Sequence, residues 1–162
     1  MRPVESQGVR VATIRTGMVM SMEGGAFPLM VWPFRLSVGG RLGRGRQWLP
    51  WIHMVDEVRA IRFLLENEAA RGPFNLVAPQ SLRNADFTTM LGKVLGRPSW
   101  LHLPALVFRL ALGEMSVLLL AGQRASSDKL QDLGFRFRLP EAEAALGDVL
   151  RGRSPRHGGA AA

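Results

Sequence analysis

The chain has 162 residues, of which 47% are hydrophobic and 21% charged, as in a globular domain rather than a disordered segment. It contains no cysteine, which excludes disulfide bonds and thiolate metal sites. A reducing compartment is compatible with this, and no basic, apolar leader opens the sequence, so we expect a cytoplasmic protein. The formal net charge is +8, but the arginines are spread along the chain, so we do not expect nucleic-acid binding as the main function.

Residues 1–8 are expected to form a loose lead-in, and residues 9–16 (VRVATIRT) a strand that is covered on both faces, as in a parallel sheet. Gly17 ends this strand. The segment 27–36 is apolar and contains two prolines, which leaves open a short broken helix or a covering loop.

A loop rich in glycine and arginine, residues 39–47, leads into residues 48–53, which are expected to be extended because Pro50 disfavours helix at the residue before it. A helix is then expected from Asp56, as its N-cap, to about Asn67. The spacing of its apolar residues predicts one buried face. These residues are Val58, Ile61, Leu64 and Leu65.

The second half of the chain is expected to be mainly helical. Asn84 is a candidate N-cap for a helix that ends at Gly96, and Ser127 caps a short helix. Residues 135–139 (FRFRL) alternate between apolar and basic side chains. Pro140 is expected to open a last helix that runs to Leu150.

The segment 103–122 is long enough to cross a bilayer, but it contains Arg109 and Glu114, so we expect a pair of buried helices and no membrane span. These elements divide the chain into a sheet region with a loop (9–80), a mainly helical region (81–150) and a disordered basic tail (151–162).

Hydrolytic and metal-dependent chemistry has no recognisable residue pattern in this chain. There is no Gly-x-Ser-x-Gly motif, and the three histidines, His53, His102 and His157, are far apart. His53 and Asp56 are three positions apart, but no third ligand follows at a recognisable spacing. We therefore expect no metal site and no nucleophilic triad, and we assign no catalytic residue.

Eight short motifs follow one another along the chain. They are RTGMVMS (15–21), Gly-Gly (24–25), PFRLSVGGRLGRGRQW (33–48), PWIHMVDEV (50–58), GPFNLVAP (72–79), NADF (84–87), LALGEMSVLLLAGQR (110–124) and KLQDLGFRF (129–137). In this order they resemble the C-terminal half of an extended short-chain dehydrogenase/reductase. The resemblance is closest to NAD-dependent epimerase/dehydratase-like members, in the sugar-nucleotide-epimerase-like branch that ends in a domain of unknown function.

The resemblance implies an α/β fold, with the C-terminal part of a Rossmann-like parallel sheet followed by a small, mainly helical substrate-binding or cap region. It also implies NAD or NADP as the cofactor. The other half of such a protein carries the glycine-rich turn that binds the pyrophosphate, and usually a tyrosine and lysine that handle the proton. This chain has no tyrosine and no such turn, so we expect it to be inactive alone. Its expected partners are the missing N-terminal half or a second copy, and a small anionic substrate.

The same resemblance suggests site residues. Thr16, Gly17 and Val19 are expected beside the nicotinamide, with a plain strand-to-loop turn as the alternative. The candidate substrate-binding residues are Arg41, Arg44, Arg46, Gln47, Trp51 and His53. Arginine has forked donors that suit a diphosphate or another anion. Core packing is the alternative for Trp51, and a half-buried architectural place is the alternative for His53.

Three polar residues are expected to be structural: Asp56 and Asn84 as helix caps, and Asn75 through bonds to a neighbouring backbone. A second function also stays open from the sequence. Arg41, Arg44 and Arg46 form a dense basic group, which suits a non-catalytic module that binds RNA or an acidic partner.

Overall fold

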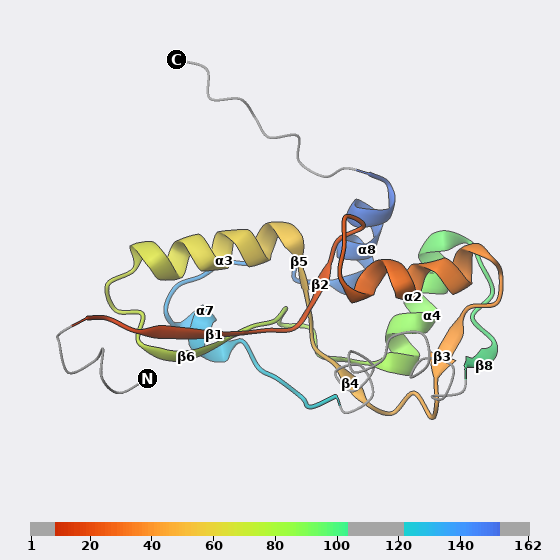
Figure 1. Cartoon of the computed structure of the whole chain (residues 1–162), viewed down its shortest axis with the longest axis horizontal. Helices are drawn as coiled ribbons and strands as arrows, with labels where there is room; N and C mark the ends of the chain where they lie inside the picture. The colour runs from red at the N-terminus through yellow and green to blue at the C-terminus, as the bar shows by residue number, and fades with distance from the viewer. Residues whose placement is uncertain (1–8, 104–121, 153–162) are drawn as a thin grey trace, which may run out of the picture.

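The structure is a computed structural model that describes residues 9–103 and 122–152 (Figure 1). The expectations for residues 1–8, for a helix pair within 103–122 and for most of the tail 151–162 lie outside these residues. In the part of the chain that is described, no helix is both long and apolar enough to cross a membrane.

The chain folds into an α/β structure, which confirms the predicted fold class. The described elements are β1 (Ala12–Thr16), β2 (Met18–Met20), α2 (Ala26–Arg35), β3 (Gly40–Leu42), β4 (Trp48–Leu49), β5 (Trp51–His53), α3 (Met54–Glu66), β6 (Gly72–Leu76), β7 (Leu82–Arg83), α4 (Asn84–Leu95), β8 (Leu101–Leu103), α7 (Asp128–Asp132) and α8 (Ala142–Leu150). The pairs β1–β6, β2–β5 and β3–β8 are parallel, and β4–β7 is antiparallel.

β1 and β2 are two parts of one extended segment that changes partner at Gly17. β1 pairs with β6 in a register that places Thr16 opposite Leu76. β2 pairs instead with β5, so that Met18 lies opposite Trp51. Figure 1 shows the consequence: α3, β1, β6 and α7 lie at one end of the molecule, α2, α4, β3 and β8 at the other, and β2 and β5 connect them.

Two apolar clusters form the core, one at each end. The larger cluster joins α2, α4 and α8 and includes Phe27, Phe34, Trp51, Phe87 and Leu146. The smaller cluster joins α3, β6 and α7 and includes Ile52, Leu64, Phe74, Leu130 and Phe135. Because β5 contributes Trp51 to one cluster and Ile52 to the other, this short strand holds the two ends together.

The prolines in the segment 27–36 do not prevent a helix. Pro28 lies in the first turn of α2, where the backbone N–H would have no helical partner, while Pro33 lies inside the helix. The helix is stabilised by packing: Phe27 and Phe34 are fully buried in the larger cluster. The structure therefore selects the helix over the loop.

The helix caps predicted at Asp56 and Asn84 are both shifted. α3 begins at Met54, and His53 is its N-cap, because its Nδ1 accepts a hydrogen bond from the Val55 N–H at 3.2 Å. Asp56 is thus inside the first turn, and its prediction as N-cap is wrong. α4 has Arg83 as its N-cap without a side-chain cap, and Asn84 is its first helical residue, so that prediction is also wrong.

The other local predictions for the second half hold better. Gly96 ends α4 in the left-handed conformation (φ 62°), and Ser127 is the N-cap residue of α7, although its side chain makes no capping hydrogen bond. Phe135 is buried while Arg136 and Arg138 are exposed, so the alternation is present although the segment forms no strand. Each of these features depends on residues that are neighbours in the sequence: a glycine, a small polar residue or a period-two pattern.

Candidate functional site

The carboxyl end of β1 meets β5 and β6 at Gly17. The Gly17 N–H donates to the Leu76 carbonyl at 3.1 Å, and the Met18 N–H donates to the Pro50 carbonyl at 2.8 Å. A Cβ at Gly17 would lie 2.8 Å from the Pro50 oxygen and 3.0 Å from Val77 Cγ1. The junction therefore needs a residue without a side chain.

A buried carboxyl lies directly beside this junction. The Thr16 hydroxyl donates to Glu57 Oε1 at 2.8 Å, and Glu57 Oε2 is buried without a hydrogen-bond partner among the described residues. Burial raises the pKa of Glu57, against the smaller lowering effect of the Thr16 hydrogen bond. The first turn of α3 thus places an ionisable group one hydrogen bond away from an exposed strand end.

His53 is enclosed between the start of α3 and α8. Its side chain is 3% exposed, and Nε2 lies 3.4 Å from Asp148 Oδ2 without the alignment of a hydrogen bond. Burial lowers the pKa of His53, while the Asp148 and Asp56 carboxylates raise it and Arg138 lowers it. Because Nδ1 accepts from Val55, His53 has an architectural place and faces no surface that a substrate could reach.

Asp56 joins α3 to the segment before α8. Its carboxylate is fully buried and accepts from the backbone N–H groups of Arg138 and Leu139, both at 2.8 Å. Arg59 donates to the same carboxylate at 2.8 Å. Asn75 has a similar bridging place, because its Nδ2 donates to the Ser126 carbonyl at 3.0 Å, the kind of backbone contact that the sequence predicts.

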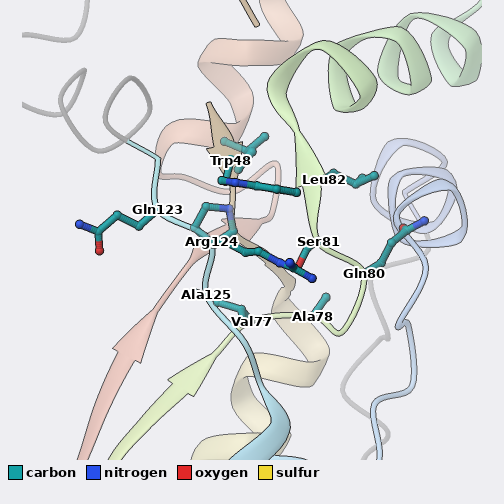
Figure 2. Close-up of a pocket in the computed structure, with 11 residues that line it drawn as sticks. Trp48, Val77, Ala78, Gln80, Ser81, Leu82, Gln123, Arg124 and Ala125 are labelled. Atoms are coloured by element: carbon teal, nitrogen blue, oxygen red, sulfur yellow. The ribbon is translucent and has the colours of Figure 1, made fainter. Parts of the chain in front are cut away.

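Two arginines lie close to the ring of Trp48, the first residue of β4. The guanidinium carbon of Arg83 is 4.7 Å from the centre of the Trp48 ring, and that of Arg124 is 5.3 Å away. Figure 2 shows Arg124 extended beneath the ring toward Ser81. Within the described residues, neither arginine forms an ion pair with a carboxylate. The ring therefore packs against two cations, of which Arg83 also donates from Nη1 to the Arg46 carbonyl.

A small pocket lies under Trp48 and shares walls with the strand junction. The lining includes Pro50, Val77, Gln80, Ser81 and Arg124, with no acidic residue. Pro50 and Val77 are also the residues that a side chain at Gly17 would meet. The cationic Trp48 site and the end of β1 are therefore adjacent.

Some of the predicted substrate-binding residues lie near Trp48, and others do not. Arg46 is exposed, and its carbonyl accepts from Arg83 Nη1 at 2.7 Å. The Gln47 carbonyl accepts from the Asn84 N–H at 2.9 Å. Arg44 is exposed in the turn before them. Arg41 lies in β3, beyond that turn, and pairs with His102 of β8.

Trp51 is not available to a substrate. It is 1% exposed, and its Nε1 donates to the Gln80 carbonyl at 3.0 Å. An enclosed ring presents no face for stacking, so the structure corrects the predicted contact in favour of core packing. The partly buried ring of Trp48, three residues earlier, is the one that lies beside two arginines.

Sequence reasoning did not single out Glu57, Arg83 or Arg124. No neighbouring residue in the sequence marks any of the three as part of a site. The two arginines come close to Trp48 only when the chain folds. The one local signal is that Arg124 ends a motif of the family resemblance, LALGEMSVLLLAGQR. Gly122 in that motif packs so closely on Trp48 that a side chain there would overlap the Trp48 carbonyl.

Comparisons with known proteins agree with this architecture. The family model described as a domain of unknown function (DUF1731) matches residues 103–149. The "Epimerase family protein MW0731" of Staphylococcus aureus (strain MW2) is 43% identical over 147 residues, which are 91% of this chain and 49% of that protein.

Solved structures show the same relationship. The human epimerase family protein SDR39U1 (isoform 2), solved with NADPH, is 35% identical with a TM-score of 0.82, over 88% of this chain and 49% of that one. A nucleoside-diphosphate sugar epimerase from Corynebacterium glutamicum is 32% identical with a TM-score of 0.71, over 91% of this chain and 28% of that one.

Fold and sequence together define an epimerase-like protein of Rossmann type. Over about nine tenths of its length the chain is similar to epimerase family proteins, which confirms the resemblance found in the sequence. It spans about half the length of the curated relatives it matches.

The residues present fit a nicotinamide dinucleotide only in part. The end of β1 is an open strand terminus of the kind that borders a ligand in a parallel sheet. The pyrophosphate, however, needs a glycine-rich turn between a strand and a helix. The sequence contains no Gly-x-x-Gly-x-x-Gly or Gly-x-Gly-x-x-Gly pattern, so this part of the cofactor site is not supplied by this chain.

Proposed function

We propose that this chain is the substrate-binding half of an NAD(P)-dependent, sugar-nucleotide epimerase-like oxidoreductase and that it is inactive without a dinucleotide-binding half. The bound cofactor would supply the hydride acceptor. Thr16, Gly17 and Val19 form the nicotinamide edge, and the arginines around Trp48 bind an anionic group of the substrate.

The observation that carries this proposal is the adjacency of the two parts. Arg83 and Arg124 flank Trp48, and the pocket beneath shares Pro50 and Val77 with the surroundings of Gly17. A substrate anchored by an anion at Trp48 would therefore extend toward the end of β1. Paired arginines bind phosphate through charge-assisted, bidentate hydrogen bonds.

Arg44 and Arg46 add positive charge in the loop that leads into β4, and both are exposed. They contribute long-range attraction for an anion rather than its fixed geometry. Glu57 and Thr16 lie on the other side of the junction. There the Thr16 hydroxyl is oriented by the carboxyl, and we assign it a positioning role beside the nicotinamide.

The alternative function, a basic module for RNA or an acidic partner, receives no support from the comparisons, which agree on the epimerase family. The geometry also differs from what that function would use. Arg83 and Arg124 both lie near the Trp48 ring, and Arg124 lines a pocket of about 10 Å³ beneath it, which offers no extended surface for a nucleic-acid strand.

The test is the binding of inorganic pyrophosphate to the full chain, measured by calorimetry at low salt. We expect Arg124→Ala and Arg83→Ala each to weaken binding by about tenfold, the effect of losing one charge-assisted contact. Arg35→Ala is the matched control, because Arg35 also lies over a tryptophan, Trp32, at 5.7 Å, but far from the pocket. Absence of binding, or equal losses in all three variants, would overturn the proposal.

A further inference from the structure

His53 ends β5 and directly precedes α3, and its side chain is the N-cap of that helix. Nδ1 accepts the Val55 N–H at 3.2 Å, which satisfies one of the backbone donors that a helix start leaves without a partner. Serine, threonine, asparagine and aspartate are the usual caps, and none of these loses its acceptor near neutral pH. A histidine cap holds only while the ring nitrogen that accepts is free of a proton.

The cap determines which ring nitrogen carries the hydrogen. In a neutral imidazole one nitrogen is a donor and the other an acceptor, so the use of Nδ1 as acceptor leaves the hydrogen on Nε2. Nε2 lies 3.4 Å from Asp148 Oδ2 of α8, a helix that Figure 1 shows beside β2. A second proton therefore has to bind Nδ1, directly opposite the Val55 N–H. Two donors would then face each other, and the capping bond would be lost.

Charged groups from three parts of the chain face this ring. Asp148 of α8 and Asp56 of α3 favour the charged imidazolium, and Arg138, in the segment before α8, opposes it. Burial opposes it more strongly than any of these charges, so the pKa of His53 lies below its ordinary value of 6.5. The stabilisation that the neutral ring contributes is fully present above pH 6.5 and is lost as the pH falls through the folded-state pKa.

The first turn of α3 carries two contacts to distant parts of the chain. The buried Asp56 carboxylate accepts the backbone N–H groups of Arg138 and Leu139, both at 2.8 Å. Glu57 Oε1 accepts the Thr16 hydroxyl at the end of β1, also at 2.8 Å. Both carboxyls belong to the turn whose geometry depends on the cap. Loss of the cap would therefore loosen both contacts at once.

We propose that His53 is a pH-sensitive cap that controls the first turn of α3. When the pH falls, a proton from the solvent binds Nδ1, the hydrogen bond from Val55 breaks, and the first turn frays. Residues 138–139 and the Thr16 end of β1 then lose a fixed partner. α8 itself stays attached, because Leu146 is buried in the larger apolar cluster. The device goes beyond the proposed function, since it needs neither substrate nor cofactor.

Hydrogen exchange on the full chain between about pH 7.5 and pH 5 tests the proposal, because this range spans the ordinary histidine pKa. We expect the protection factors of the Val55, Arg138 and Leu139 amides to fall about fivefold in the wild type as the pH falls, the usual effect of losing one N-cap. In His53→Asn they should stay constant, because the asparagine oxygen caps a helix and binds no proton in this range. His102→Asn, in β8, is the matched control and should keep the wild-type fall.

Glu57 lies in the same turn, and burial raises its pKa, so its titration is a second source of pH dependence. Glu57→Gln should keep the fall in protection, because the effect belongs to His53. Circular dichroism checks that each variant folds.

Nitrogen NMR of the His53 ring in the wild type gives a readout that depends on no variant. We expect the hydrogen on Nε2 at neutral pH and a titration midpoint below 6.5. A hydrogen on Nδ1 at neutral pH, constant protection in the wild type, or an equal fall in His53→Asn would overturn the proposal. Loss of the fall in Glu57→Gln would do the same.

Discussion

Gly17 lies where β1, β5 and β6 meet, and its missing side chain allows them to do so. A methyl group there would lie within 3.0 Å of the Pro50 carbonyl and of Val77 Cγ1, and the backbone atoms cannot move without breaking the Met18–Pro50 hydrogen bond. We predict that Gly17→Ala lowers the free energy of unfolding by about 1–3 kcal/mol, the usual cost of overpacking.

Denaturant unfolding measures this change. Gly24→Ala is the control, because a Cβ at Gly24 would meet nothing within 4 Å. Equal free energies of unfolding for the two variants would show that the close approach at Gly17 does not affect stability.

Glu57 makes stability depend on pH at the same junction. Burial raises its pKa from the ordinary value of 4.5, so the folded state holds the proton more tightly than the unfolded chain. The stabilisation from this proton is fully present below pH 4.5 and is lost as the pH rises through the folded-state pKa. We predict that Glu57→Gln removes this part of the pH dependence.

The measurement is the free energy of unfolding of both proteins between about pH 4 and pH 7, the window above the ordinary carboxyl pKa. Glu68→Gln, at an exposed position, should leave the wild-type profile in place. A constant difference between wild type and Glu57→Gln at every pH would contradict the assignment.

For single residues, the sequence predicts those roles that depend on neighbouring positions in the chain. It places Gly17 at a strand end and predicts a backbone bond for Asn75. It does not find Glu57, Arg83 or Arg124, because their partners Thr16 and Trp48 are 35 or more positions away. Such pairs are formed by the fold, and nothing in the neighbouring residues marks them.

Among the elements, α3 depends on one side chain for its attachment to the last part of the chain. Asp56 accepts two backbone hydrogen bonds from residues 138 and 139. In Asp56→Asn one carboxylate oxygen becomes an N–H₂ group that faces a backbone donor. We predict a loss of about 2–4 kcal/mol in the free energy of unfolding, because a buried polar contact is left unsatisfied.

Denaturant unfolding with hydrogen exchange at residues 135–139 checks this prediction. Asp132→Asn, at an exposed position of α7, is the matched control. Unchanged protection of residues 138 and 139 in Asp56→Asn would show that the carboxylate does not hold the segment.

The same helix has only part of the buried apolar face that its sequence predicts. Its period predicts one buried face with Val58, Leu64 and Leu65. Leu64 is buried, whereas Val58 and Leu65 are exposed, and the buried first turn includes Asp56 and Glu57 instead. The apolar residues therefore lie on more than one side of the helix, and among the described residues only the side with Leu64 is covered.

At the scale of the whole molecule, the fold class and the family resemblance can be predicted from the sequence. The reason is that eight motifs occur in the same order as in the family, even where individual residues differ. The arrangement of the two ends does not follow from it. That arrangement depends on the exchange of strand partners at Gly17, and on strands of only two or three residues, which have too little periodicity to be recognised.

We propose that these 162 residues supply the substrate-binding half of a nucleotide-dependent enzyme and do not bind the dinucleotide by themselves. A titration of NADPH, followed by its nicotinamide fluorescence, tests it directly. We predict no binding to the chain alone below about millimolar concentrations, and binding about a hundredfold tighter or more once the other half of the S. aureus relative is added. Micromolar binding by the chain alone would contradict the claim.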